Sequence, residues 1–234
     1  MKENKKYISL SHWIDESTPS YGNQGGFSRN SISSIKKGKT ANSEEWFFNN
    51  HLGTHIDFPK HFDDTGLSSS DFKDPFFVFK KIGLIVLEKP VLPGQLISVV
   101  DLLPQLNLLP KSTEVLLLKT HFEQYRLKPM YWKNNPGYNV ELSVFFRSHF
   151  TNLSVFGFDS ISLAPLHHRS MGKKAHKAFL NKENPILIIE DMSLFKLNNK
   201  MKINELIIAE FPVATSDGTP VNCILKVNKS KKLN

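Results

Sequence analysis

The residues with the clearest chemical potential lie close together between positions 51 and 61. His51, His55 and His61 are three of the nine histidines of the chain, and Asp57 lies among them. Imidazole nitrogens and carboxylate oxygens are ligands that Zn²⁺ and Mn²⁺ accept in proteins. Each of these histidines alone is most often an ordinary polar residue, but the four side chains together indicate a metal site.

The backbone around these side chains is predicted to be extended. His51 and His55 have the spacing of a helical zinc motif, which would place both on one helix face. Gly53 and Pro59 disfavour a helix interior, and Leu52 stands where helical zinc proteases carry a glutamate. A strand therefore fits this segment better than a helix.

An extended segment sets the distances between the candidate ligands. His55 and Asp57 would share one face, about 7 Å apart at Cα. His51 would lie about 13 Å from His55, so both reach one ion only if the chain bends at Gly53. A proline then ends the strand before His61. This separation favours a role for His61 beside the metal rather than on it.

The pattern of these residues is similar to a known signature. The string His51-x-Gly53-Thr54-His55-x-Asp57-x-x-x-His61-Phe62 resembles that of the metal-dependent cyclase/hydrolase family, which includes bacterial kynurenine formamidase and isatin hydrolase. The resemblance extends over most of the chain and includes segments 8–11, 116–120, 135–137, 157–162, 175–180, 188–192 and 217–221.

The resemblance implies a site with two divalent ions per chain, Zn or Mn. Asp57 would be a ligand of both ions, and Glu190 would bridge them. His61 matches the general acid/base of the family. The complete set of metal ligands that the resemblance implies is His51, His55, Asp57, His176 and Glu190.

Neighbouring residues offer alternatives for two of these ligands. Asp191 is an alternative to Glu190 at the end of the same apolar run. His167 or His168 is an alternative to His176. Each of these substitutes breaks the local match to the family pattern.

The reaction that the resemblance implies is hydrolysis of the C–N bond of an amide, formamide or lactam by a metal-activated water. Bound divalent ions lower the pKa of water and polarise a carbonyl, and an imidazole with a pKa of about 6.5 exchanges protons at neutral pH. No organic cofactor is expected. The alternatives are a lactone or ester hydrolase and a catalytically silent binding or scaffold protein. Loss of ligands or of His61 would mark the silent protein, and none is lost.

Aromatic residues near the motif are candidates for binding a small, aromatic or apolar substrate. Phe47 precedes the motif and Phe62 ends it. Tyr21 occupies an early segment, residues 19–23, that corresponds to the aromatic loop of the formamidases but lacks their Pro-Gly-Asp sequence. Packing in the core is the alternative interpretation of these aromatic side chains. The substrate-binding candidates are thus Tyr21, Phe47 and Phe62.

Short β-type runs alternate with fewer helical patterns, which predicts a strand-rich α/β protein. The resemblance narrows this class to the swivelling β/β/α domain of the cyclase type. The predicted strands are 7–11, 83–87, 115–119, 154–158, 186–189 and 205–209, and the predicted helices are 97–106, 139–150 and 172–181.

The composition is typical of a globular protein, with 40% hydrophobic and 22% charged residues. The single cysteine, Cys223, excludes an intramolecular disulfide. The apolar runs are far shorter than the roughly 18 to 20 residues that a membrane span needs, and the N-terminus lacks a signal-peptide core. We therefore expect a cytoplasmic protein that does not bind membranes.

No repeat or linker divides the chain, so residues 1–234 are expected to form one hydrolase domain. The segment 21–43 is interpreted either as a lid or pocket-forming loop or as a disordered insert. Residues 225–234 are expected to be a flexible basic tail, which accounts for part of the formal net charge of +8 without a nucleic-acid partner. The resemblance also implies a homodimer or homotetramer with active sites near subunit contacts.

Overall fold

One large mixed sheet organises the chain. The computed structural model describes residues 5–72, 74 and 76–228, and its strands pair in the order β5-β12-β13-β4-β11-β10-β8-β6, with β1 paired to β13. β6, at one end of this order, contacts β12, the second strand from the other end, so the sheet is nearly closed. The strands are β1 Lys5–Ser9, β4 His55–Asp57, β5 Phe76–Phe79, β6 Ile82–Val86, β8 Val115–Lys119, β10 Val155–Phe158, β11 Leu187–Glu190, β12 Ile203–Glu210 and β13 Gly218–Asn228.

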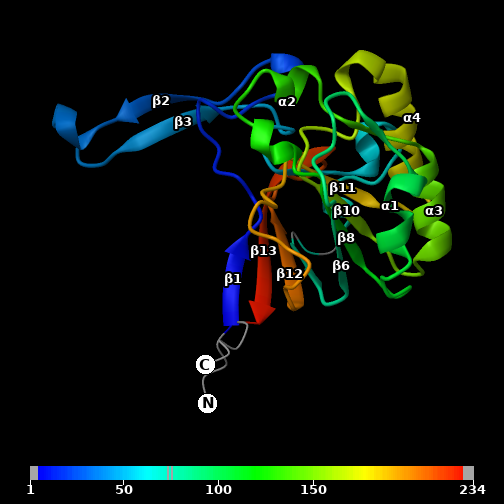
Figure 1. The fold of residues 1–234 in the computed structure, drawn as a ribbon. Helices are drawn as coiled ribbons and strands as arrows, with labels where there is room; N and C mark the ends of the chain where they lie inside the picture. The colour runs from blue at the N-terminus through cyan, green and yellow to red at the C-terminus, as the bar shows by residue number, and fades with distance from the viewer. Residues whose placement is uncertain (1–4, 73, 75, 229–234) are drawn as a thin grey trace.

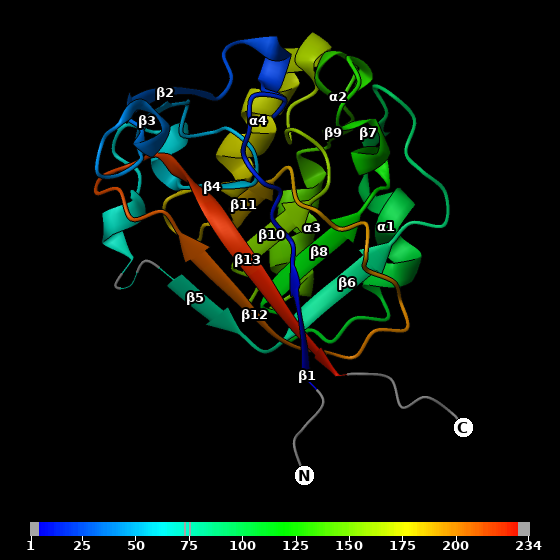
Figure 2. The ribbon, with the colours of Figure 1, turned by 90° about the vertical axis from the view of Figure 1, so that its left-hand side faces the viewer.

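The sheet has a parallel half and an antiparallel half. β6, β8, β10 and β11 are parallel, and every residue of β8, β10 and β11 is buried. Continuous apolar runs are typical of parallel strands that are covered on both faces. β4, β13, β12 and β5 pair antiparallel, and burial alternates along β12 and β13. Figure 2 shows β5, β12, β13 and β1 side by side on the face opposite the main helices.

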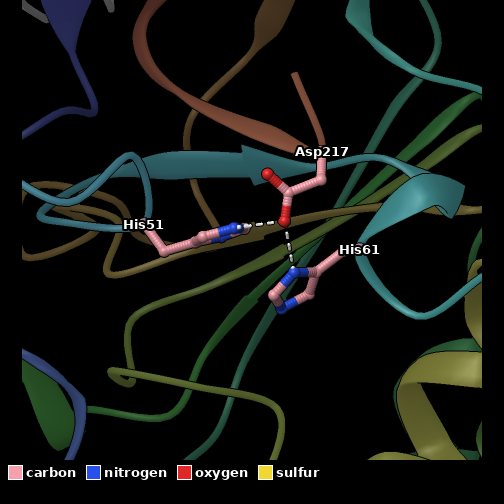
Figure 3. Close-up of side chains that lie close together, drawn as sticks. All are labelled: His51, His61 and Asp217. Carbon is pink, nitrogen blue, oxygen red and sulfur yellow. Dashed lines mark hydrogen bonds and ion pairs between the residues drawn. The ribbon is translucent and has the colours of Figure 1, made fainter. Parts of the chain in front are cut away.

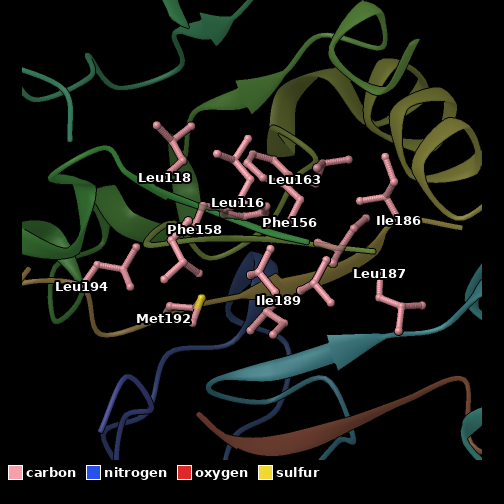
Figure 4. Close-up of a cluster of buried hydrophobic side chains, with 14 of the residues drawn as sticks. Leu116, Leu118, Phe156, Phe158, Leu163, Ile186, Leu187, Ile189, Met192 and Leu194 are labelled. Carbon is pink, nitrogen blue, oxygen red and sulfur yellow. The ribbon is translucent and has the colours of Figure 1, made fainter. Parts of the chain in front are cut away.

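The main helices cover the parallel half of the sheet (Figure 1). They are α1 Val99–Leu106, α3 Glu141–His149 and α4 Arg169–Phe179. A short helix, α2 Met130–Lys133, lies between α1 and α3 in the sequence. The apolar cluster of Figure 4 occupies both faces of these strands: Leu116 and Phe156 lie on the side of the helices and Ile189 on the opposite side, and all three are fully buried. Burial of each such side chain stabilises the fold by about 1.5–3 kcal/mol.

The three predicted helices exist with shifted boundaries. The expected start of α1 at Ile97 is wrong, because Leu96–Ile97 form β7 and pair with β9, Gly137–Tyr138. The helix begins after Ser98, whose backbone N–H and hydroxyl both donate to the Asp101 carboxylate at 2.7 Å. Asp101 thus satisfies the backbone N–H of the N-cap residue, as in a capping box.

The segment 21–43 is not a disordered insert, and its start, at Tyr21 and Gln24, lines the cavity described below, as expected of a pocket-forming loop. It contains a 3-10 turn, Tyr21–Asn23, followed by β2 Ser28–Ser33, which pairs with β3 Ser43–Phe47. The resulting hairpin extends away from the body of the molecule (Figure 1). Only the start of the segment approaches the site described below.

The expected flexible tail of residues 225–234 is wrong for residues 225–228, which belong to β13. Leu225 and Val227 are buried on β13 because they continue the alternating inward face of Val221 and Cys223. Residues 229–234 lie outside the described residues. No helix in the described part of the chain is long and apolar enough to cross a membrane.

Candidate functional site

Two adjacent strands bring the first part of the site together. β4 lies between β11 and β13, and His55 is directly opposite Glu190 on β11. His55 and Asp57 are two residues apart on β4, so their side chains share one face of the sheet. Both are almost fully buried, at 3% and 1% exposure. The predicted strand therefore places three of the candidate ligands side by side.

The predicted bend at Gly53 returns His51 to the same face. Gly53 has a φ of 70°, in the left-handed region, and a Cβ at this position would lie 3.2 Å from Ile14 Cγ1. Both the conformation and the space favour glycine. After the bend, His51 Nδ1 lies 2.9 Å from Asp57 Oδ1. The bend that the sequence predicts is thus confirmed.

Helix α4 supplies the imidazole of His176. Gly172 allows this helix to pack closely, since a Cβ there would lie 2.1 Å from the Cβ of Ala164. His176 Nε2 is 3.3 Å from Glu190 Oε1 and 3.8 Å from Asp57 Oδ2. The close packing therefore brings an imidazole from a helix to carboxylates from two strands.

The tautomers of the buried histidines are set by backbone carbonyl groups. Nδ1 of His55 donates to the Gly53 carbonyl, and Nδ1 of His176 donates to the Gly172 carbonyl, both at 2.9 Å. In each ring this leaves Nε2 facing the carboxylates of the cluster. Metal-binding histidines are commonly oriented by such a hydrogen bond to the second ring nitrogen.

The Asp57 carboxylate is the best indication that the cluster can hold a cation. Its Oδ2 atom is buried and has no hydrogen-bond partner among the described residues, an arrangement that is costly for a carboxylate. Burial acts to raise the pKa of Asp57, but hydrogen bonds from His51 and His55 outweigh it and hold the pKa well below its usual value. An ionised, unpartnered oxygen among imidazoles fits a divalent cation.

Two groups of three donors share this carboxylate. Within each group the ligand atoms lie within 4.8 Å of one another. The groups are His51, His55 and Asp57, and Asp57, His176 and Glu190. All five predicted ligands therefore meet in one cluster, with Asp57 common to both groups.

His61 stands beside this cluster and is held by an aspartate that sequence reasoning missed. His61 lies in the 3-10 turn Pro59–His61, as expected after the proline. Asp217 Oδ2 accepts from His61 Nδ1 at 2.8 Å and from His51 Nε2 at 3.0 Å (Figure 3). Asn50 Nδ2 donates to the other oxygen of Asp217 at 2.8 Å. The only signal for Asp217 was its place in segment 217–221 of the family resemblance.

The electrostatics of the two imidazoles differ. Burial acts to lower the pKa of His51, but hydrogen bonds to Asp217 and Asp57 raise it to about 10. Burial lowers the pKa of His61, and the positive charge on His51 acts in the same direction. His61 is therefore neutral near pH 7, whereas His51 holds a proton that a cation must displace.

The alternative ligands lie elsewhere. Asp191 has a φ of 49°, and its carboxylate accepts from Arg126 Nη2 at 2.7 Å and from the Tyr131 hydroxyl at 2.5 Å. His167 and His168 are exposed in the turn that precedes α4. The structure thus brings Glu190 and His176 to the cluster, and not their alternatives.

A cavity of about 400 Å³ opens beside the cluster. Tyr21 and Phe62 line it, and the Phe62 ring stacks on His176 at 4.6 Å between centroids. Phe47 is not among the lining residues; it lies on β3 with 48% of its surface exposed. Two of the three substrate-binding candidates are therefore at the cavity, and Phe47 is not.

Comparison with known sequences assigns the chain to a family. The sequence model of the Cyclase family matches residues 8–165, which is more than half of the chain. The chain belongs to the Cyclase family. The matched range contains the 51–61 motif but ends before His176 and Glu190, so the fold alone brings these two residues to the motif.

Solved structures share the fold of this cyclase-family chain at low sequence identity. An isatin hydrolase bound to the product analogue thioisatinate has a TM-score of 0.76 and 15% identity, over 97% of this chain and 94% of that one. Isatin hydrolase A from Labrenzia aggregata, bound to benzyl benzoate, has a TM-score of 0.76 and 17% identity, over 97% and 95%. A predicted metal-dependent hydrolase from Bacillus stearothermophilus has a TM-score of 0.69 and 18% identity, over 95% and 98%. The predicted fold class is confirmed.

Proposed function

We propose that this cyclase-family chain is a metal-dependent hydrolase that cleaves the C–N bond of an amide, formamide or lactam. The observation that carries the proposal is the convergence of three imidazoles and two carboxylates around the unpartnered Asp57 Oδ2, beside a cavity that His61 also lines. The hydrolases among the solved structures of the same fold support the reaction class.

The chain offers ligands for two divalent ions, Zn or Mn. His51, His55 and Asp57 would hold one ion. Asp57 would also bind the second ion, together with His176 and Glu190. When bound, such ions lower the pKa of a water molecule and polarise the carbonyl group of a substrate. The fold supplies a rigid support for the site, because the ligands come from two paired strands and one packed helix.

A third group of donors, His51, His61 and Asp217, is a weaker candidate for a cation. Asp217 Oδ2 already accepts two hydrogen bonds from imidazoles, whereas Asp57 Oδ2 accepts none. The three residues instead suit proton transfer. The bond from His61 Nδ1 to Asp217 fixes the ring and leaves Nε2 free to take a proton.

His61 would act as the general acid/base. Its lowered pKa leaves the imidazole neutral at the start of the reaction, so that Nε2 accepts a proton from the attacking water. The protonated ring, stabilised by Asp217, then returns the proton to the departing nitrogen. Such proton transfer typically accelerates a reaction by about 10²–10⁴-fold.

The proposal is tested first by counting metal ions. We expect elemental analysis to find close to two Zn or Mn ions per wild-type chain and none in Asp57→Ala, because Asp57 contributes to both groups of donors. Asp64→Ala removes an exposed carboxylate of the neighbouring loop and should retain both ions. The metal-loaded wild type should hydrolyse a member of a panel of formamides, lactams and aryl amides.

Other outcomes would change the interpretation. A single ion would remove the two-metal assignment and reopen the roles of His176 and Glu190. No ion after reconstitution with Zn²⁺ and Mn²⁺ would favour the binding or scaffold protein.

A further inference from the structure

The residue that follows Glu190 has an uncommon backbone conformation. Asp191 has a φ of 49°, in the left-handed region that few residues other than glycine adopt. It stands directly after β11, where this strand brings Glu190 to the candidate metal cluster. Such a conformation persists when the surrounding structure holds it, and it is enriched at functional sites. The contacts of Asp191 therefore bear on the neighbouring ligand.

The carboxylate of Asp191 is anchored by the segment that follows β8. Arg126 ends the 3-10 turn Phe122–Tyr125, and Tyr131 lies on α2. Arg126 Nε donates to Oδ1 at 2.9 Å, Arg126 Nη2 donates to Oδ2 at 2.7 Å, and the Tyr131 hydroxyl donates to Oδ1 at 2.5 Å. A guanidinium group that holds both oxygens fixes the orientation of a carboxylate. Water has little access to this anchor, since the side chains of Asp191 and Arg126 are 3% and 11% exposed.

The backbone of Asp191 is tied to the strands on both sides of β11. This strand lies between β10 and β4. On the β10 side, the Asp191 N–H donates to the Ser160 carbonyl at 2.9 Å. On the β4 side, the Thr54 hydroxyl donates to the Asp191 carbonyl at 2.6 Å, and Thr54 directly precedes His55. Both backbone polar groups and both carboxylate oxygens of Asp191 are thus engaged.

Glu190 needs this support because it stands at the end of its strand. The pairing of β11 with β10 stops at Ile189, so Glu190 is paired only with His55 on β4. The ends of paired elements open most easily. Glu190 must nevertheless keep Oε1 at 2.6 Å from the Leu163 N–H and at 3.3 Å from His176 Nε2. An anchor at the next residue keeps this end of the strand closed.

We propose that Asp191 is a positioning residue that holds Glu190 in place for the second ion, and that Arg126 and Tyr131 act through it. This inference rests on the two-metal site of the proposed function. The first group of donors comes from β4 and from the bend at Gly53, and does not include Glu190. Loss of the anchor should therefore weaken binding of the second ion and spare the first.

Calorimetric titration of the metal-free protein with Zn²⁺ tests this selectivity. Asp191→Gly leaves the left-handed backbone accessible and removes the anchoring carboxylate. Its second ion should bind about 10-fold or more weakly than in wild type, the scale seen for residues that orient metal ligands. Its first ion should bind as in wild type. Asp191→Asn keeps an oxygen acceptor and tolerates the left-handed region, so it should restore part of the affinity for the second ion.

Two further variants separate positioning from general destabilisation. Asp191→Gly leaves Arg126 enclosed without its counter-charge, which destabilises a protein. The double variant Arg126→Met with Asp191→Gly removes both charges and should keep a Tm close to that of wild type, yet still bind the second ion weakly. Glu205→Gln is the control, because it breaks the Glu205–Lys226 ion pair at the end of β13 remote from β4. It should bind both ions as wild type does.

The histidine rings provide a readout that needs no metal. His176 and His55 face the Glu190 carboxylate with their Nε2 atoms at 3.3 and 3.6 Å. His149 lies on α3 and contacts the Leu106 carbonyl instead. NMR spectra of metal-free, ¹⁵N-histidine-labelled Asp191→Gly at the pH of the wild-type spectrum should show shifted ring signals for His176 and His55. The signals of His149 should not move.

The two readouts distinguish failure of this inference from failure of the proposed function. Shifted rings in Asp191→Gly, together with a wild type that binds no second ion, would refute the two-metal hydrolase and leave Asp191 as the residue that positions Glu190. A wild type with two ions, together with unshifted rings or with equal affinities in Asp191→Gly, would refute the positioning role and leave the proposed function. Equal weakening of both ions would also refute it, because destabilisation alone predicts that result.

Discussion

Asp217 joins two imidazoles that the proposed function treats differently. One of its oxygens accepts from both His51 and His61, and Gly218 next to it leaves room for the His51 ring, since a Cβ there would lie 2.3 Å from His51 Cε1. A single carboxylate therefore orients a candidate ligand and the candidate acid/base.

Replacing this carboxylate with an amide should uncouple the two roles. In Asp217→Asn the amide cannot stabilise a protonated His61, so kcat should fall by about 100-fold, the usual scale of general acid/base catalysis. Metal content, measured by elemental analysis, should stay at the wild-type value. Asp64→Asn is the charge-matched control and should retain full activity. Loss of metal from Asp217→Asn would instead show that Asp217 is a ligand.

His61 itself permits a complementary test. His61→Ala should retain its metal while kcat falls by about 100-fold or more, because the proton donor and acceptor is removed. Added imidazole, which fits the space left by the ring, should restore part of the rate. An empty site in this variant would mean that His61 binds the metal.

At the scale of residues, the sequence predicts the local part of the site well. His51, His55, Asp57 and His61 lie within one short segment, where spacing and the bend at Gly53 are visible in the sequence. Asp217 was missed because the fold brings it to His61 from 156 positions away. A contact over such a separation leaves no local pattern.

At the scale of elements, β12 carries a carboxylate on its inward face. Glu210 follows Leu206 and Ile208 on this face, is only 8% exposed, and has an Oε2 atom without a hydrogen-bond partner among the described residues. Burial raises the pKa of Glu210 from 4.5 to about 7. The neutral form is therefore the one that the fold favours.

This carboxylate should make stability depend on pH. The unfolded chain releases the Glu210 proton near pH 4.5 and the folded chain near pH 7, so wild type loses stability as pH rises through this window. Glu210→Gln stays neutral, and its Tm should exceed that of wild type by a margin that grows from pH 4.5 to pH 8. Differential scanning calorimetry at several pH values measures this margin. A constant margin would contradict the assignment.

The strands that were predicted best are the most completely buried ones. The strand at 115–119 was predicted with its observed ends because four consecutive apolar residues, 115–118, are buried on both faces before Lys119 ends the run. β13 was missed entirely, since polar Asn222 and Lys226 stand between its inward apolar residues and leave no continuous apolar run. The hairpin β2–β3 was missed because its residues are almost all exposed and carry no alternation.

At the scale of the whole molecule, the hairpin β2–β3 requires an explanation. A two-stranded hairpin alone is at best marginally stable in water, yet this one extends from the body and exposes Ile32, Ile35, Trp46 and Phe47. We propose that a second copy of the chain covers it, in the symmetric dimer that is the commonest form of homo-oligomer.

Light scattering coupled to size exclusion should therefore give at least twice the chain mass of 26.7 kDa. Trp46→Glu places a charge in the proposed contact and should shift the protein toward the monomer. Leu108→Glu changes an apolar residue away from the hairpin that is more exposed than Trp46, at 82% against 61%, and should remain associated. A monomeric wild type at micromolar concentration would refute the dimer.

The position of β4 links the site to the stability of the whole protein. This strand is hydrogen-bonded on both sides, to β11 and to β13, so its residues do not separate locally while the sheet remains intact. Opening of the site and global unfolding then become one cooperative event. Any ion that binds only the folded chain is consequently coupled to the complete unfolding equilibrium, and its concentration sets the temperature at which the whole chain unfolds.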